Sequence, residues 1–360
     1  MRLTFKQSIL LLLTTLLTAC NTPFTRSNRN PQQDFNNSPY AKFKQERASV
    51  EPLTETSPIV TPTQINISNK KSNVSLPQVQ PLNITGNLKI GGSTGVLPLN
   101  KLIYDRFIAL GYSGVINFSN IGADESIQLF CQQEKFDLLT LARPMNKSEI
   151  AACQAKGIEP ISFNIGKDAV AIIVSRQNDF LDRVTLPMLA EIFTQEKWSD
   201  VDPNFPDKPI ERFPTGPNAS FDLVVDKVLE GNGTPLLNAP NTTLYWYEQP
   251  MIQRLSNNIY GISFVSSPVL KEATNSVKSI VVEGTTPQSI KLTNKKYPLE
   301  LSLYIYVDRE QLKKQPELNS FVNFYLTHVN EQIEDAGLFP LSPQELDKSK
   351  TQFLQIMQSS

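Results

Sequence analysis

The sequence predicts an α/β fold with two lobes, on the strength of three observations. Apolar strand-like runs alternate with amphipathic helix-like segments, which is typical of α/β proteins with largely parallel sheets. Several turns from a strand into a helix carry glycine or short polar side chains. The alternation runs from near Gly86 to near Leu346, and about 260 residues is long for one core and suits two.

Strands and helices are predicted from hydrophobic periodicity. Runs rich in apolar and β-branched residues predict strands at 88–90, 115–118, 169–174, 259–264 and 303–307. Helical spacing predicts helices at 99–110, 125–133, 147–155, 186–193, 220–229 and 317–336. The helix at 220–229 is the clearest, because its apolar residues follow the i, i+3, i+4, i+7 stripe.

Composition excludes several classes of function. A formal net charge of −1, with 19% charged residues, lacks the basic excess of a nucleic-acid-binding protein, so no nucleic-acid partner is expected. The single histidine, His328, argues against imidazole metal sites and Ser/His/Asp triads. It follows Phe321, Phe324 and Tyr325 at helical spacing, so we expect it at the edge of an apolar stripe. We expect no catalytic residue, metal or cofactor.

The N-terminal segment MRLTFKQSILLLLTTLLTAC has the pattern of an export signal. Arg2 and Lys6 precede a short apolar run that ends at Leu17, which is too short for a stable membrane span. The final Leu-Thr-Ala-Cys resembles a bacterial lipoprotein signal, whose cysteine becomes the lipidated first residue of the mature chain. We therefore expect a signal peptide at 1–20, a lipid such as palmitate on Cys20, and an extracytoplasmic chain anchored to a bacterial membrane.

Residues 21–85 are rich in Asn, Ser, Thr, Pro and Gln and show no sustained apolar period. Such a segment cannot bury enough apolar surface to fold, so it predicts a disordered tether. A flexible coil of this length would span roughly 40–50 Å.

The turns before the helices suggest where a ligand would bind. LKIGGSTGVLPLNKL at 88–102, SNIGADESIQLF at 119–130 and GPN at 216–218 each place glycine or a short polar residue at a helix start. Free N–H groups there can bind an anion, although the same residues can simply cap helices and form turns. Arg143 follows an apolar run and directly precedes a proline, and it could bind an anion. Alternatively, it forms only an isolated surface salt bridge. Helix N-termini with one guanidinium suit a tetrahedral oxyanion.

At these residues the chain resembles the phosphate-binding proteins of ABC importers. The resemblance includes LKIGGSTGVLPLNKLIYDRF, FCQQEKFDLLTLARPMNKSEIAACQAKGIE, KDAVAIIV, IYGISFV and YPLELSLYIYVDRE, and it runs in order from about Gly86 to Glu345. It implies a two-lobe periplasmic binding protein of type II (Venus flytrap) with crossovers near 169–174 and 261–265. The implied lobes are 86–168 and 264–346 for the first and 169–263 for the second, with a C-terminal tail at 347–360.

The resemblance implies the first-lobe ligand residues position by position. The family's Gly-Ser-Thr turn falls on Gly92, Ser93 and Thr94 and is intact. Its Ser-Arg-Pro falls on Ala142, Arg143 and Pro144, so the guanidinium is kept and one hydroxyl is lost.

The second-lobe turn and one loop depart further from the family pattern. The family's Ser-Gly-Thr falls on Asn218, Ala219 and Ser220, where alanine reduces the openness that glycine provides. Its glycine-rich loop falls on 122–126 and contains Asp124 and Glu125. One of these carboxylates can accept a hydrogen bond from monohydrogen phosphate and reject sulfate. Alternatively both repel a dianion, or both are ordinary acidic residues of a helix start.

Cys131 and Cys153 remain once Cys20 is assigned to the lipid. An even number of remaining cysteines in an exported chain favours a disulfide between them, and these two cysteines lie on either side of Arg143 in the sequence. The alternative is two buried thiols.

The leading hypothesis is an extracytoplasmic lipoprotein, acting as a monomer, that captures phosphate or a related oxyanion and delivers it to an ABC permease. The second is a degenerate binding protein that acts as a scaffold, sensor or interaction module. An enzyme such as a phosphatase is least supported, because the sequence shows no nucleophile–base pair or metal cluster.

Overall fold

The computed structural model describes residues 73–359, except for residues 120, 133–134, 217 and 293–295 and the side chains of 291–292. The expected signal peptide, the lipidated Cys20 and the expected tether as far as residue 72 lie outside the described residues. Within the described part, no helix is both long enough and apolar enough to cross a bilayer.

The main sheet has the strand order β2-β1-β3-β10-β4-β7-β6, with β8 paired to β4, and β5 and β9 form a separate pair. The strands are β1 Leu88–Gly92, β2 Ile116–Ser119, β3 Leu138–Leu141, β4 Pro160–Ser175, β5 Arg183–Val184, β6 Glu211–Arg212, β7 Gly261–Ser266, β8 Val277–Ser279, β9 Val281–Val282 and β10 Glu300–Asp308.

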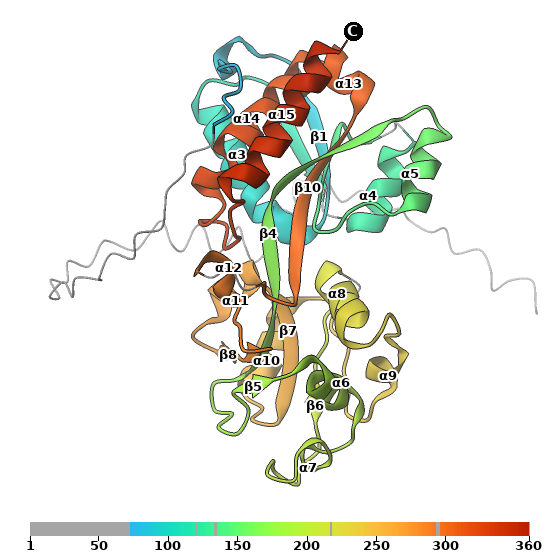
Figure 1. Cartoon of the computed structure of the whole chain (residues 1–360), viewed down its shortest axis with the longest axis vertical. Helices are drawn as coiled ribbons and strands as arrows, with labels where there is room; N and C mark the ends of the chain where they lie inside the picture. The colour runs from blue at the N-terminus through green and yellow to red at the C-terminus, as the bar shows by residue number, and fades with distance from the viewer. Residues whose placement is uncertain (1–72, 120, 133–134, 217, 293–295, 360) are drawn as a thin grey trace, which may run out of the picture. The chain divides into compact units, whose positions relative to one another are not determined.

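Helices surround these strands (Figure 1). They are the 3-10 turns η1 Pro81–Asn83 and η2 Thr94–Val96, and α3 Leu97–Ala109, α4 Ala123–Phe130, α5 Lys147–Gln154, α6 Leu186–Thr194, α7 Trp198–Val201, α8 Ala219–Val228, α9 Thr234–Asn238, α10 Glu248–Ser256, α11 Ser267–Ala273, α12 Ser289–Leu292, α13 Arg309–Lys314, α14 Pro316–Gln332 and α15 Pro343–Gln358. The five predicted strands and six predicted helices are confirmed, with shifted ends.

The expectation of largely parallel sheets is wrong. Strands β1, β2 and β3 are parallel, and so are β6 and β7, but β10 runs antiparallel to both β3 and β4. Strand β4 is also antiparallel to β7 and β8. The reason is that two long neighbouring strands, β4 and β10, carry the chain out of the first lobe and back into it in opposite directions (Figure 1).

Each lobe has its own apolar core, and the described residues belong to one compact unit. Along β4, Phe163 and Ile165 lie in the first core, whereas Ile172 and Val174 lie in the second. Because one strand serves both cores, the lobes are joined by hydrogen-bonded strands, with one register shift between Leu303 and Tyr304, rather than by a loose linker.

The second lobe extends further along the chain than expected. Strand β7 pairs with residues 170–174 of β4 inside the second lobe, so the crossover expected near 261–265 is wrong. Helix α11 and strands β8 and β9 still contribute to second-lobe cores, as do Tyr297 and Leu299. The chain returns to the first lobe along β10, which pairs with residues 160–169 of β4 and then with β3.

The folded body begins before residue 86, which corrects the last part of the expected tether. Leu76 and Val79 pack against the first core, and Asn323 Nδ2 donates to the carbonyl of Pro77 at 3.1 Å. His328 on α14 lies beside this segment, with its ring 4.4 Å from that of Phe324 at the edge of the apolar face, as predicted.

The expected C-terminal tail is instead helix α15. Phe353 and Ile356 are 2% and 4% exposed in the first core. Ser342 and Glu345 form a capping box at its start, with Pro343 in the first turn. This Ser-Pro-x-Glu spacing predicts a helix start, and the apolar residues at helical spacing provide the buried face.

Candidate functional site

The turn from β1 into α3 is held against the end of β3. Gly92 has φ +141°, and a Cβ there would lie 2.0 Å from the carbonyl oxygen of Thr140, so only glycine fits. Ser93 donates its N–H to that carbonyl at 2.9 Å, and its Oγ accepts the N–H of Ala142 at 3.1 Å. Ser93 is buried, whereas Thr94 is exposed at the start of η2. The first N–H groups of this turn, on Thr94 and Gly95, have no partner within the turn by helix geometry.

A buried chain of hydrogen bonds holds α3 in place. The hydroxyl of Tyr325 on α14 donates to Asn100 Oδ1 at 2.9 Å, and Asn100 Nδ2 donates to Thr140 Oγ1 at 2.7 Å. This links α14, α3 and β3, so the N–H groups at the start of α3 are preorganised toward a ligand.

Arg143 is held by two carboxylates rather than left open. Its Nη1 and Nη2 donate to the two oxygens of Glu149 at 2.9 and 2.7 Å, and Nη2 also pairs with Asp124. The hydrogen bonds to Glu149 raise the pKa of Arg143 further above its ordinary value, with a smaller contribution from Asp124 and despite partial burial. The side chain of Glu149 is 19% exposed and that of Asp124 is 87% exposed. We call these three residues the Arg143 cluster.

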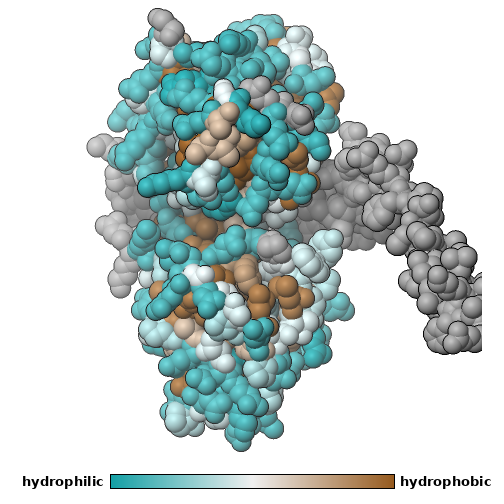
Figure 2. All heavy atoms as spheres, turned by 90° about the vertical axis from the view of Figure 1, so that its right-hand side faces the viewer, coloured by the Kyte–Doolittle hydropathy of each residue, from teal (hydrophilic) through white to brown (hydrophobic). Residues whose placement is uncertain are grey.

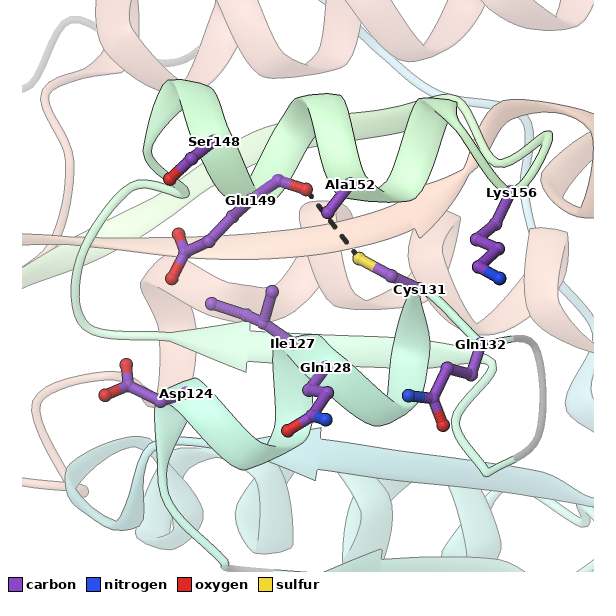
Figure 3. Close-up of a pocket in the computed structure, with 9 residues that line it drawn as sticks. All are labelled: Asp124, Ile127, Gln128, Cys131, Gln132, Ser148, Glu149, Ala152 and Lys156. Atoms are coloured by element: carbon purple, nitrogen blue, oxygen red, sulfur yellow. Dashed lines mark hydrogen bonds between the residues drawn. The ribbon is translucent and has the colours of Figure 1, made fainter.

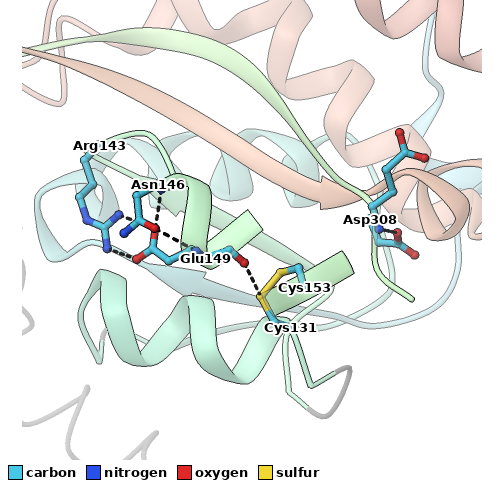
Figure 4. Close-up of a disulfide and its surroundings, with 7 residues drawn as sticks. Cys131, Arg143, Asn146, Glu149, Cys153 and Asp308 are labelled. Atoms are coloured by element: carbon cyan, nitrogen blue, oxygen red, sulfur yellow. Dashed lines mark hydrogen bonds and ion pairs between the residues drawn. A yellow bond between two sulfur atoms is a disulfide. The ribbon is translucent and has the colours of Figure 1, made fainter. Parts of the chain in front are cut away.

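Local sequence explains how the cluster forms (Figure 4). Asn146 and Glu149 make a capping box at the start of α5, and Glu149 Oε2 accepts the N–H of Asn146 at 2.7 Å. The predicted disulfide is present: Cys131, just after α4, joins Cys153 on α5, with their Cα atoms 4.4 Å apart. The two helices whose first turns supply the carboxylates are therefore stapled near their C-terminal ends.

The second-lobe turn is a well-capped helix start. Asn218 Oδ1 accepts the N–H of Phe221 at 2.9 Å, and its Nδ2 donates to the carbonyl of Thr215 at 3.3 Å. The amide of Asn218, expected to donate to an anion, is thus turned to its own loop. Ala219 packs against both cores and Ser220 is buried, and their N–H groups begin α8.

Electrostatic coupling brings α8 to the Arg143 cluster. Burial raises the pKa of Asp222, on the first turn of α8, and the charge of Asp124 raises it further, whereas Arg143 lowers it. We call the Arg143 cluster together with the first turn of α8, which carries Asp222, the junction. It combines one guanidinium with three carboxylates, which lie in the first turns of α4, α5 and α8.

Several residues of the junction were not singled out from the sequence. The Asn-x-x-Glu spacing at 146–149 predicts the capping box, but not that Glu149 also binds Arg143. Helix dipoles favour acidic residues in first turns generally, so the position of Asp222 in the sequence does not indicate a functional site. Glu125 is exposed and makes no hydrogen bond among the described residues, which fits a plain helix-start residue.

A separate cavity of about 350 Å³ lies between α4 and α5 (Figure 3). Asp124 and Glu149 lie toward one end, Lys156 lies toward the other, and Cys131 is part of its lining. Its lining contains neither Arg143 nor any second-lobe residue, but it shares Asp124 and Glu149 with the junction and therefore adjoins it. Figure 2 views the side that bears α4, α5 and α8, where hydrophilic surface surrounds apolar atoms near the middle.

Two α/β lobes joined by long antiparallel strands, with helix starts facing each other at the junction, define the class of two-lobe solute-binding proteins. A model of the PBP superfamily domain matches residues 77–328, and the chain belongs to this superfamily.

Two relatives and one solved structure are similar along most of their length. Protein SphX of Synechocystis is 25% identical over 288 residues, which are 76% of this chain and 84% of that protein. The phosphate-binding protein PstS of Staphylococcus saprophyticus is 24% identical, over 74% of this chain and 84% of that protein. The ABC-type phosphate transport receptor of Vibrio cholerae has a TM-score of 0.58 at 18% identity, over 71% of this chain and 100% of that chain, a likeness of fold.

Proposed function

We propose that this protein binds phosphate, or a closely related oxyanion, at the junction and releases it to an ABC importer. The names of the relatives support the ligand class. The observation that carries the proposal is that the start of α8, where Ala219 packs against both cores, is close enough to Arg143 for its charge to act on Asp222. We propose Gly92, Ser93 and Thr94 from the first turn, Arg143, and Asn218, Ala219 and Ser220 from the second as the ligand-binding residues.

The roles of the proposed residues follow from their surroundings. The N–H groups of Thr94, Ala219 and Ser220 point outward from helix starts, where anions are favoured. The hydroxyl of Ser93 can donate while its oxygen accepts the N–H of Ala142. An arriving oxyanion would displace Asp124, the exposed partner, from Arg143, while Glu149 keeps the guanidinium oriented.

The binding experiment is calorimetric titration of the purified protein with phosphate and with sulfate. We expect Arg143→Ala to weaken binding at least tenfold, about 1.4 kcal/mol, because charge-assisted bonds are the strongest donors available. Arg106→Ala is the matched control, since Arg106 pairs with Glu331 on the first lobe and is absent from the junction. Equal affinity of wild type and Arg143→Ala would refute the proposed site.

We also propose that Cys20 carries a lipid that anchors the protein outside the cell, that the permease is its partner and that it acts as a monomer. Labelled palmitate should enter the wild type and not Cys20→Ala. Labelling of both would refute this attachment point.

A second candidate, a degenerate binding protein that acts as a scaffold or sensor, is favoured by one observation. Two carboxylates pair with Arg143, and a third, Asp222, is close enough to be influenced by its charge; such an excess of negative charge repels a dianion. If it holds, wild type binds neither anion, and the Asp124→Asn/Asp222→Asn double variant begins to bind. Tight binding by wild type would reject this candidate.

A further inference from the structure

Two consecutive aromatic side chains, Trp246 and Tyr247, lie open to solvent on the second lobe. They are 72% and 73% exposed, and Leu244 close to them in the chain is 40% exposed. Tryptophan and tyrosine usually bury most of their area, because their rings make the strongest apolar contacts available to a protein. We call Trp246 and Tyr247 the aromatic pair, and its exposure indicates a surface that a ligand or partner covers.

The segment that carries the aromatic pair is held in place. The N–H of Tyr245 donates to the carbonyl of Pro214 at 2.9 Å, and its own carbonyl accepts the N–H of Gly216 at 3.1 Å. The ring of Tyr245 packs edge-on against Phe213, with 6.1 Å between the centroids. Helix α10 begins directly after the pair. The backbone of the pair is therefore fixed at both ends, which lowers the entropic cost of binding.

The aromatic pair lies at the edge of the second-lobe sheet where α8 begins. Segment 242–245 forms two parallel bridges with segment 212–215, so it runs beside the end of β6 and in the same direction. The first segment leads through the pair into α10, and the second leads into α8. A Cβ on Gly216 would lie 3.1 Å from the side chain of Phe221, in the first turn of α8. Because parallel segments end at the same edge of a sheet, one ligand can contact both the start of α8 and the pair.

The loop between the pair and α8 offers few side-chain donors to a ligand. Asn218 Nδ2 donates to the carbonyl of Thr215 at 3.3 Å, and Ala219 has no polar side-chain atom. A terminal phosphate oxygen needs donors, because leaving it unpaired costs the full price of its desolvation. An ester oxygen carries less charge and has less need of them. This side of the junction therefore suits an oxygen that bears an organic group.

We propose that the junction takes a phosphate monoester whose organic group carries a planar ring, as in a nucleoside monophosphate. The phosphoryl group lies at Arg143 and the start of α8, and the ring stacks on Trp246 and Tyr247. This inference rests on the proposed function. A monoester keeps three terminal oxygens and a charge of about −2, so the donors proposed for phosphate serve it equally. Stacking on aromatic side chains then adds affinity that inorganic phosphate cannot gain.

A small ligand fits the aromatic pair better than a protein partner does. Among the described residues, the large apolar side chains exposed on the second lobe are Leu237, Leu244 and the pair. A stable protein interface buries about 800 Å² on each partner and surrounds its anchors with further contacts. Two rings beside an anion site instead match one planar ring joined to one phosphoryl group.

The test is calorimetric titration of the purified protein with phosphate, ribose 5-phosphate, adenosine 5′-monophosphate (AMP) and adenosine. We expect AMP to bind about tenfold or more tighter than ribose 5-phosphate and than adenosine. In Trp246→Ala/Tyr247→Ala the affinities for AMP and ribose 5-phosphate should become nearly equal. Leu82→Ala is the matched control, because Leu82 is a 74% exposed apolar residue of the first lobe, and it should leave the AMP preference unchanged.

Fluorescence tests the same contact in the unaltered protein. The chain has two tryptophans, and Trp198 is fully buried, with its Nε1 donating to the carbonyl of Tyr260 at 3.1 Å. Quenching by acrylamide therefore reports on Trp246. AMP should protect Trp246 from acrylamide, and ribose 5-phosphate should not.

The outcomes separate this inference from the proposed function. If wild type binds phosphate tightly but AMP no better than ribose 5-phosphate, the inference is overturned, the proposed function stands and the pair is a surface for another partner. Equal affinities for AMP and adenosine overturn the inference, because the ring would then bind without the phosphoryl group. An unchanged AMP preference in the double variant overturns the stacking role. A wild type that binds neither phosphate nor AMP overturns both the inference and the proposed function.

Discussion

Two arginines, Arg143 and Arg212, have similar sequence surroundings but different kinds of hydrogen-bond partner. Each lies at the end of a strand and shortly before a proline. Arg143 is held by the carboxylates of Glu149 and Asp124. Arg212 is 0% exposed and donates only to backbone carbonyls, those of Ile192 at 2.8 Å, Ile210 at 3.1 Å, Pro240 at 2.9 Å and Gln195.

The difference shows how the partners of a guanidinium decide its role. Carboxylates at a partly exposed position can be exchanged for an anionic ligand, because the ligand offers the same kind of oxygen. The carbonyls around Arg212 belong to the end of α6 and to loops of the second lobe, so Arg212 binds elements together. Burial lowers the pKa of Arg212 to about 10, which still leaves it charged at neutral pH.

The largest effect is expected from Arg212→Leu. Four carbonyls lose their donor, those of Ile192 and Ile210 at buried positions, and breaking such a network costs about 3 kcal/mol or more of unfolding free energy. Denaturant titration measures it. Arg254→Leu is the control, since Arg254 is 57% exposed and pairs with Glu211 at 3.2 Å, and it should change stability by less than about 1 kcal/mol. Similar unfolding curves for the two variants would contradict the assignment of Arg212 as structural.

The second-largest effect is expected from reduction of the Cys131–Cys153 disulfide. It closes a loop with a sequence separation of 22, worth roughly 3 kcal/mol in the chain-entropy relation. Because it staples the helices that carry Asp124 and Glu149, its loss should loosen the surroundings of Arg143 and leave those of Arg212 unchanged. Hydrogen exchange with and without reductant measures this contrast. Two free thiols found by mass spectrometry of unreduced protein would dismiss the bridge.

Asp168 is a buried acidic residue, so it can be compared with the buried basic residue Arg212. The pKa of Asp168 is raised by burial from 3.8 to about 6, so the folded state binds its proton more tightly than the unfolded state. The resulting stability is fully present below about pH 3.8 and is lost as pH rises through about 6, a change of up to about 3 kcal/mol. Asp168→Asn should lack this component. Parallel stability–pH curves for the two proteins between pH 4 and 7 would refute it.

The two partners of Arg143 should differ in their effect on stability. Glu149→Gln removes a half-buried charge partner and part of the α5 capping box, at a cost of about 1–2 kcal/mol. Asp124→Asn removes an exposed partner and should change stability by about 0.5 kcal/mol or less. Thermal unfolding of both variants compares them, and a larger loss in Asp124→Asn would reverse their assigned roles.

The sequence by itself determined the features that depend on local spacing. Hydrophobic periodicity predicted the major strands and helices, the Gly-Ser-Thr turn marked a helix start, and the parity of the cysteines predicted the disulfide. These signals work because helices, caps and turns are stabilised by contacts between residues a few positions apart.

Only the tertiary structure decided which distant groups meet. Asp124 reaches Arg143 because α4 packs beside α5, and Asp168 is buried because β4 passes between two cores. The return along β10 rather than β7 depends on strand pairing across more than a hundred residues. Such pairings leave no local pattern, because the energy that selects them comes from burying surfaces shared by segments far apart in the chain.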